Sequence, residues 1–222
     1  MRNPFIRKDL DTISQKTKYD YVKETKRDNF TFLNKTICKK NQTVLIGDSI
    51  IEIYNVTDLF FDYTKESGIA VYNRGISGDT SDRLLERFND NALLIEPRNL
   101  VILIGTNDIG ISDFSFTTGN VEKMLSLAKE KCPDANIILE AILPVNNHFR
   151  IRMAGDRNNK HIAMLNAKLK EVALKYEVTF ADFTSALSCE NGEFKKEFTY
   201  DGLHPNAVGF NEISKNLIPL LK

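Results

Sequence analysis

A serine, a histidine and an aspartate in this chain lie in settings that suit nucleophilic catalysis. Ser49 follows an apolar run and the residues Gly47 and Asp48, at the point where a strand would end and a helix would begin. A serine hydroxyl attacks a carbonyl only when a base removes its proton, so a histidine is required. His204 has suitable neighbours, because Asp201 precedes it by three residues and Gly202 permits a tight turn between them. We predict Ser49 as nucleophile, His204 as base and Asp201 as the carboxylate that fixes the imidazole tautomer.

Each of these residues also has an ordinary structural interpretation. Ser49 alone is typical of a helix N-cap, and the segment around Asp201 alone is typical of a turn before a helix. His148 and His161 are the other two histidines, and their polar surroundings favour surface positions. The catalytic interpretation depends on the serine, the histidine and the aspartate occurring together.

Acyl transfer also requires hydrogen-bond donors for the oxyanion that forms on the attacked carbonyl. The backbone N–H of Gly78, the side-chain amide of Asn107 and the backbone N–H of Ser49 are the candidates. Gly78 can equally be a turn glycine, and Asn107 can equally be a loop residue that binds its own backbone.

The elements that would position these residues follow from the apolar pattern. Buried strands are predicted where apolar runs end at Gly, Asn, Asp or Pro, over residues 43–46, 69–72, 100–104, 136–142 and 178–180. Runs that are apolar on both sides favour a parallel sheet covered on both faces. Ligands of such sheets bind beyond the carboxyl ends of the strands, where Ser49, Gly78 and Asn107 would converge.

Segments with helical periodicity alternate with these strands. Apolar stripes predict one helix from near Thr80 and a second after Gly119, with two more over 162–172 and 208–221. This alternation implies right-handed crossovers and an α/β fold with three α/β/α layers. Residues 1–42 contain few apolar residues, and we interpret them as an N-terminal extension, helical around 9–27, that packs on a domain spanning 43–222. An oligomer contact is a possible role for it.

Composition argues against several classes of partner. Among 222 residues, Lys+Arg and Asp+Glu each number 30, so no net charge favours nucleic acid. Three widely spaced cysteines are typical of reduced thiols, and the chain shows no apolar run of signal-peptide or membrane-span length. These features predict a cytoplasmic protein without a membrane span.

Four blocks of the chain together resemble the SGNH hydrolases, also called GDSL esterases/lipases. The blocks are Gly47-Asp48-Ser49-Ile50, Gly78 within Ile76–Thr80, Gly105-Thr106-Asn107-Asp108, and Asp201-x-x-His204-Pro205. Ile50 replaces the leucine of the family's name, one apolar residue for another. The first 42 residues have no counterpart in the resemblance.

The resemblance implies a flavodoxin-like fold with a five-stranded parallel sheet. It implies a triad of Ser49, Asp201 and His204, and an oxyanion hole of Ser49, Gly78 and Asn107. We assign Asp48, beside the nucleophile, to substrate binding. The implied mechanism proceeds through an acyl-enzyme with no metal and no organic cofactor. A neutral imidazole is required, so activity should fall as the pH drops through about 6.5.

The substrate is less well defined by the sequence. Without an obvious hydrophobic lid, we favour a short acyl group, such as acetyl on a carbohydrate or another small ester. A lysophospholipase or thioesterase is the alternative, as is a non-catalytic module that binds a small ligand at residues 75–80. Specificity should lie in loops 50–64 and 144–160. The first has an aromatic run (Tyr54, Phe60, Phe61, Tyr63) that suits the core or an acyl pocket; the second has a basic group (Arg150, Arg152, Arg157) that suits solvent or an anion.

Overall fold

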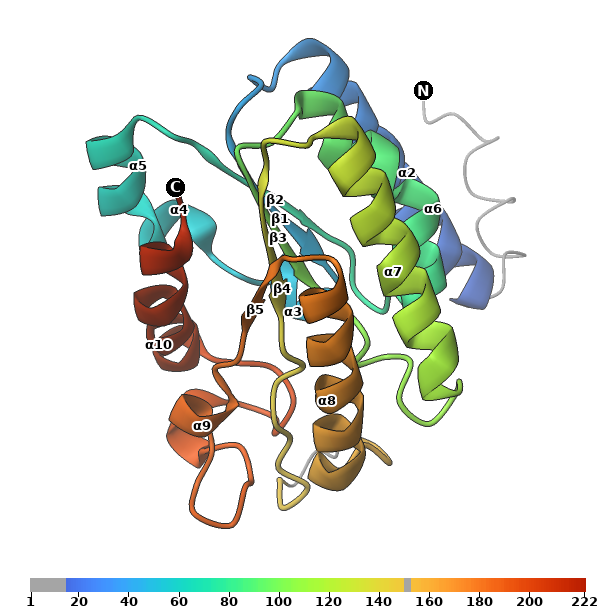
Figure 1. Cartoon of the computed structure of the whole chain (residues 1–222). Coiled ribbons are helices and arrows are strands. Elements are labelled where there is room, and N and C mark those ends of the chain that lie inside the picture. Colours follow the sequence, from blue (N-terminus) through green and yellow to red (C-terminus); the bar gives the residue numbers. More distant parts are fainter. Residues whose placement is uncertain (1–14, 150–152) are drawn as a thin grey trace, which may run out of the picture.

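The structure, a computed structural model, describes residues 15–149 and 153–222, with side chains from residue 18 onward. Its centre is one parallel sheet with the strand order β2-β1-β3-β4-β5 (Figure 1). The strands are β1 (Thr43–Gly47), β2 (Val71–Gly75), β3 (Asn99–Leu103), β4 (Asn136–Glu140) and β5 (Thr179–Ala181). This order is the flavodoxin-like one, and the predicted five-stranded α/β fold is confirmed.

Helices cover both faces of the sheet. On one face lie α6 (Ser81–Ala92), α7 (Phe114–Lys131) and α8 (Asn159–Lys175), with α2 (Gln15–Thr36) packed on α6. On the other lie α3 (Ser49–Glu52), α4 (Val56–Leu59), α5 (Phe61–Ser67), α9 (Thr184–Leu187) and α10 (Ala207–Leu217) (Figure 1). Short 3₁₀ turns are η1 (Leu93–Ile95), η2 (Lys196–Phe198) and η3 (Ile218–Leu220). None of the helices in the described ranges is long and apolar enough to cross a membrane.

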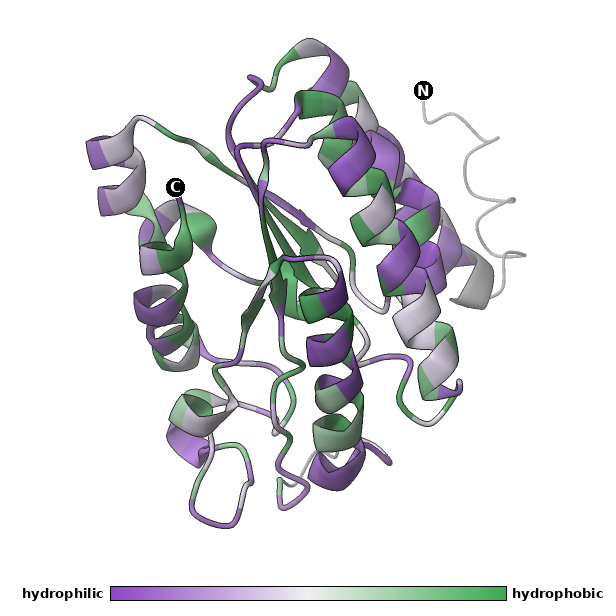
Figure 2. Cartoon of the chain, viewed as in Figure 1, coloured by the Kyte–Doolittle hydropathy of each residue, from purple (hydrophilic) through white to green (hydrophobic). Residues whose placement is uncertain are grey.

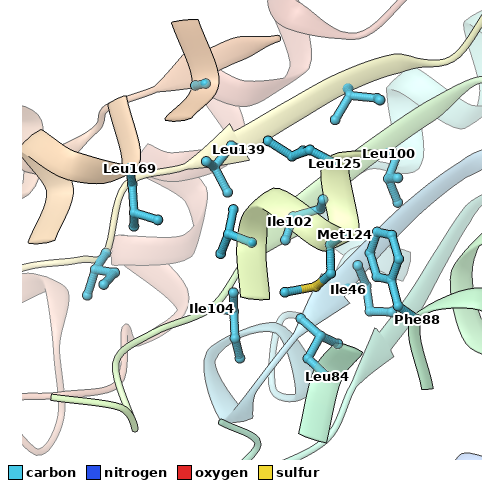
Figure 3. Packing of buried hydrophobic residues seen from close by; sticks show 14 of the residues in the cluster. Ile46, Leu84, Phe88, Leu100, Ile102, Ile104, Met124, Leu125, Leu139 and Leu169 are labelled. Carbon is cyan, nitrogen blue, oxygen red and sulfur yellow. The ribbon is translucent and has the colours of Figure 1, made fainter. Parts of the chain in front are cut away.

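The alternation of side chains along each strand builds two separate cores. Val44 and Ile46 of β1 point into the core under α6, α7 and α8, whereas Leu45 points into the core under α3 and α10. Figure 3 shows Ile46 in the first core, near Phe88 and Met124. Because both faces of the strands are buried, the sheet is a band of hydrophobic residues between helices whose outer faces are hydrophilic (Figure 2).

Several element boundaries differ from the sequence prediction. Strand β2 starts two residues late and pairs with β1 through Gly75. The strand can include Asn73 because the Asn73 side chain is satisfied by bonds to Ile51 O and Tyr54 O. Helix α7 begins at Phe114 rather than after Gly119, because Asp113 caps it by accepting a bond from the Ser115 N–H at 3.1 Å. Gly119 therefore lies inside a helix, which costs only about 1 kcal/mol.

Helix α2 packs on the α/β body, where it contacts α6. It extends to Thr36, nine residues beyond the predicted end at Arg27, whereas the predicted start at Asp9 lies outside the described residues. The α2 side chain of Asn34 donates to Asp90 O and Asn91 O, both at 2.9 Å. These bonds connect the extension to the end of α6.

Candidate active site

Ser49 is the first residue of α3 and is separated from the carboxyl end of β1 only by Asp48. The N-cap of this helix is Asp48, whose Oδ1 accepts a bond from the Ile50 N–H at 2.9 Å. The N-cap position is therefore filled by the neighbour of Ser49, and the Ser49 side chain is available for another contact. Its Oγ lies 2.9 Å from His204 Nε2.

Asp201 and His204 are joined by a turn in which the carboxylate binds both the ring and the backbone of the histidine. Asp201 Oδ2 lies 2.7 Å from His204 Nδ1, and Oδ1 accepts the N–H groups of Leu203 at 2.9 Å and His204 at 2.7 Å. Gly202, predicted as the turn residue, has a φ of +84°. An N–H on Nδ1 satisfies the carboxylate and leaves Nε2 as the acceptor for the Ser49 hydroxyl.

The electrostatics of this turn keep the carboxylate ionised. Partial burial by itself raises the pKa of Asp201. The bonds from the His204 ring, from the His204 N–H and from the Leu203 N–H outweigh burial and hold that pKa below its ordinary value. The negative charge next to Nδ1 is the charge that would stabilise a protonated imidazole.

Gly78 lies in a tight turn after β2. The turn is closed by a bond from the Asp79 N–H to Ile76 O at 3.2 Å, and Gly78 has a φ of +72°. Among the described residues, the N–H groups of Gly78 and Ser49 have no hydrogen-bond acceptor. Both predicted backbone donors are therefore unused within the part of the chain that the structure describes.

Asn107, which follows β3, is held in one orientation by its neighbours. Its Oδ1 accepts a bond from Arg157 Nη2 at 2.9 Å, so the amide nitrogen must point the other way. Nδ2 donates to Asp79 O at 3.0 Å and lies 3.4 Å from Asp48 Oδ2. One of its two hydrogens is thus well bonded and the second is only weakly engaged.

The position of Asp48 does not support its assignment to substrate binding. The residue is 0% exposed, and its carboxyl faces the Ile50 N–H and the Asn107 amide. Burial raises the pKa of Asp48 to about 7. Because the first block places its aspartate immediately before the nucleophile, the sequence suggested a contact with substrate, whereas the helix start turns the side chain inward.

A buried ion pair that the sequence analysis missed lies beneath the strand ends. Arg87 of α6 donates through Nε to Asp79 Oδ2 at 2.7 Å, and its other nitrogens bond Arg74 O and Gly47 O at 2.9 Å. The guanidinium thus connects β1, β2 and the turn that carries Gly78. The available signal was a charged residue next to Phe88 in the apolar stripe of α6.

The remaining candidate side chains lie elsewhere. His148 pairs with Glu193 at 2.9 Å, and His161 lies in the first turn of α8, where its backbone N–H donates to the N-cap side chain of Asn158 at 2.9 Å. Tyr54 and Phe60 are buried in the core rather than in an acyl pocket, and Arg157 holds Asn107, while Arg150 and Arg152 fall outside the described residues. Within the described ranges, no three or more His, Cys, Asp or Glu side chains are grouped to hold a metal ion.

Comparison with known families gives one match over most of the chain. The profile of the GDSL-like lipase/acylhydrolase family matches residues 45–211. This range contains all six predicted site residues and ends within α10, whereas α2 lies outside it.

Individual proteins are also similar to this chain. The N-acylneuraminate cytidylyltransferase of Escherichia coli is 32% identical over 184 residues, which are 79% of this chain and 41% of that protein. The alpha1 subunit of bovine platelet-activating factor acetylhydrolase IB is 25% identical over 82% of this chain and 76% of its own length. The chain therefore spans less than half of the first relative and about three quarters of the second.

Solved structures share the fold. A Streptococcus pneumoniae protein, solved as a candidate platelet activating factor, is 30% identical with a TM-score of 0.86, over 93% of this chain and 96% of that one. A GDSL-like lipase of Bacteroides thetaiotaomicron is 26% identical with a TM-score of 0.70, over 86% and 94% of the two chains.

Proposed function

The chain belongs to the GDSL-like lipase/acylhydrolase family, and from this membership we propose that it is a serine carboxylic ester hydrolase. The observation that carries the proposal is the continuous chain of hydrogen bonds from the Ser49 hydroxyl through His204 to Asp201. Its substrate would be a short acyl ester, with acetyl on a carbohydrate or another small alcohol as the favoured case.

In the proposed reaction Ser49 Oγ attacks the ester carbonyl while His204 Nε2 takes the hydroxyl proton. The oxygen of the tetrahedral intermediate would accept bonds from the Ser49 N–H, the Gly78 N–H and the weakly engaged hydrogen of Asn107 Nδ2. His204 then returns its proton to the leaving alcohol as the C–O bond breaks, which leaves an acyl group on Ser49. Water, activated by the same imidazole, releases the acid and regenerates the serine.

Two observations support a short acyl group. The acetylhydrolase relative is named for the removal of acetyl. In this chain, two of the four aromatic residues that could have lined a long acyl pocket are used for packing, because Tyr54 stacks on Phe210 at 4.4 Å and Phe60 is completely buried, whereas Phe61 is 61% exposed.

A fluorophosphonate probe tests the nucleophile directly, because it phosphonylates an activated serine. The wild type and a Ser115→Ala control, which removes an exposed hydroxyl from α7, should be labelled equally, and Ser49→Ala should not be labelled. Labelling that persists in Ser49→Ala, or an unlabelled wild type, would overturn the proposal and favour the ligand-binding alternative.

Acyl length is tested with acetyl, butyryl and octanoyl p-nitrophenyl esters. We expect kcat/KM to be highest for the acetyl ester and to fall with chain length. A preference for octanoyl would instead support a lysophospholipase or thioesterase, while the role of Ser49 would stand.

A further inference from the structure

Helix α2 reaches across the molecule to the turn that carries Gly78. The hydroxyl of Tyr19, on its first turns, donates a hydrogen bond to Ser77 O at 2.9 Å. Tyr19 and α2 lie outside the residues that match the family profile. The contact therefore connects a part of the chain outside the family profile to the proposed oxyanion hole.

The geometry of the turn links the direction of the Ser77 carbonyl to the direction of the Gly78 N–H. Gly78 is the third residue of the turn Ile76–Asp79 and has a φ of +72°, while Ser77 has a negative φ, which is the type II arrangement. Type I and type II turns differ by a flip of the central peptide, here the unit formed by Ser77 C=O and Gly78 N–H. Because this unit is planar and trans, its carbonyl and its N–H point in opposite directions. Whatever fixes Ser77 O therefore also fixes the direction of the Gly78 N–H.

Other contacts of the turn do not fix this peptide. Glu52 of α3 accepts a bond from the Ser77 N–H and also pairs with Lys26 of α2. The Ser77 N–H belongs to the preceding peptide unit, so this contact leaves the central peptide free to flip. The Tyr19 hydroxyl, in contrast, contacts the central peptide directly. It binds Ser77 O, and it also lies close to Gly78, since a Cβ added to Gly78 would be 2.6 Å from Tyr19 Oη.

We propose that Tyr19 is a positioning residue of the oxyanion hole, which holds the Ser77–Gly78 peptide so that the Gly78 N–H faces the Ser49 site. The proposal rests on the proposed esterase function. The hydrogen bond acts in two ways: it opposes the flip to a type I turn, and it polarises the peptide so that the N–H on the other side becomes a stronger donor. Both effects act on the transition state rather than on the bound ester.

Tyr19→Phe tests this role by removing only the hydroxyl. We expect kcat to fall about tenfold, less than the loss of an entire oxyanion donor, with KM nearly unchanged. The decrease should be the same for acetyl and butyryl esters, because the oxyanion is common to both. Tyr21→Phe is the matched control, since Tyr21 lies on the same helix and is 70% exposed, and its activity should equal that of the wild type.

The outcomes of these experiments distinguish the role of Tyr19 from the proposed esterase function. If the wild type is active and labelled at Ser49 but Tyr19→Phe equals Tyr21→Phe, the role of Tyr19 is refuted and the esterase function stands. A rise in KM with unchanged kcat would also refute it, because that result would mean contact with substrate. If the wild type neither labels nor hydrolyses esters, both proposals fail. A thermal unfolding midpoint equal to that of the wild type shows that a decrease in kcat does not come from loss of the fold.

Discussion

At the scale of single residues, the two carboxylate oxygens of Asp201 bind different groups. Oδ1 accepts two backbone N–H groups and Oδ2 receives the His204 ring. In Asp201→Asn the amide oxygen must remain with the backbone donors, so the NH₂ group would face Nδ1. Nδ1 would then have to accept a hydrogen bond, which places the ring proton on Nε2. A protonated Nε2 cannot take the proton of the Ser49 hydroxyl.

We therefore expect Asp201→Asn to lower kcat by about 10⁴-fold with little change in KM. Asp182→Asn is a matched control, because Asp182 also accepts a backbone N–H, from Thr184 at 2.9 Å, in a turn outside the site. Steady-state hydrolysis of p-nitrophenyl acetate measures both variants. A loss of less than tenfold in Asp201→Asn would contradict the assigned role.

Arg157 gives a second prediction at this scale. Its guanidinium donates to Thr106 O at 2.7 Å and to Asn107 Oδ1 at 2.9 Å. Because a guanidinium has only donors, the oxygen of the Asn107 amide, and not its NH₂ group, must face Arg157. Without it, Asn107 can rotate and present its oxygen to the oxyanion. Arg157→Met should lower kcat about tenfold or more at similar KM. Lys160→Met, an exposed cation of the same segment, should retain wild-type kinetics, and equal kinetics for the two variants would refute the role of Arg157.

Sequence reasoning reached the residues with distinctive local settings and missed those defined by tertiary contacts. Ser49, His204 and Asp201 were predictable because the strand end and the Asp-Gly turn limit where their side chains can go. The burial of the Asp48 carboxyl and the hydrogen bond from Arg157 to Asn107 depend on which segments meet in space. Arg157 was assigned only to a basic loop, because nothing within the loop indicates that its partner lies 50 residues earlier.

At the scale of secondary structure elements, the five strands and the helices α6, α7, α8 and α10 were predictable, but their ends were not. The short helices α4 and α5 were missed, because the segment 50–64 was expected to be a loop. Apolar runs marked every strand, but β4 ends at Glu140 rather than continuing to Ile142. Residues beyond the ladder remain buried, since Ile142 is 0% exposed and its backbone N–H bonds Asn166 Oδ1 at 2.8 Å. Apolar character therefore continues past the strand and cannot reveal where the ladder stops.

The last residue of β4 gives a prediction about stability. Glu140 is 1% exposed, and its Oε1 has no hydrogen-bond partner among the described residues. Burial raises its pKa from 4.5 to about 8. Between these values the folded protein keeps a proton that the unfolded chain has released, so the free energy of unfolding falls as the pH rises from about 4.5 to about 8.

Glu140→Gln removes this titration and preserves the shape of the side chain. The thermal unfolding midpoint of the variant, measured relative to the wild type, should therefore rise by at least about 4 °C between pH 5 and pH 8.5. Glu130→Gln, at an exposed position of α7, should show a constant difference across the same range. A constant difference for Glu140→Gln as well would show that the carboxyl is not held neutral in the folded protein.

At the scale of the whole molecule, α2 is connected to the α/β body by buried polar contacts rather than by a large apolar face. Asn34 is 7% exposed, and its Oδ1 accepts bonds from Arg74 Nε at 3.2 Å and Arg74 Nη2 at 2.8 Å. Arg74 lies on β2 and is 4% exposed, so the extension supplies a hydrogen-bond acceptor for a buried guanidinium of the body. Removing one partner of such a pair is costly, because the other remains buried without compensation. We infer that residues 15–36 and the body fold as one cooperative unit, although the sequence suggested a boundary at residue 42.

Asn34→Ala tests this cooperativity. The loss of the acceptor for Arg74 and of the donor to Asp90 O and Asn91 O should lower the free energy of unfolding by about 2–4 kcal/mol. In a chain of this size the unfolding midpoint should fall by roughly 5–10 °C, in a single calorimetric transition whose calorimetric and van't Hoff enthalpies agree. Asn29→Ala, at an exposed position of the same helix, should leave the midpoint unchanged. If α2 were an independent appendage, Asn34→Ala would instead split the transition or leave the main midpoint at the wild-type value. The sheet and its two cores would then unfold independently of the extension.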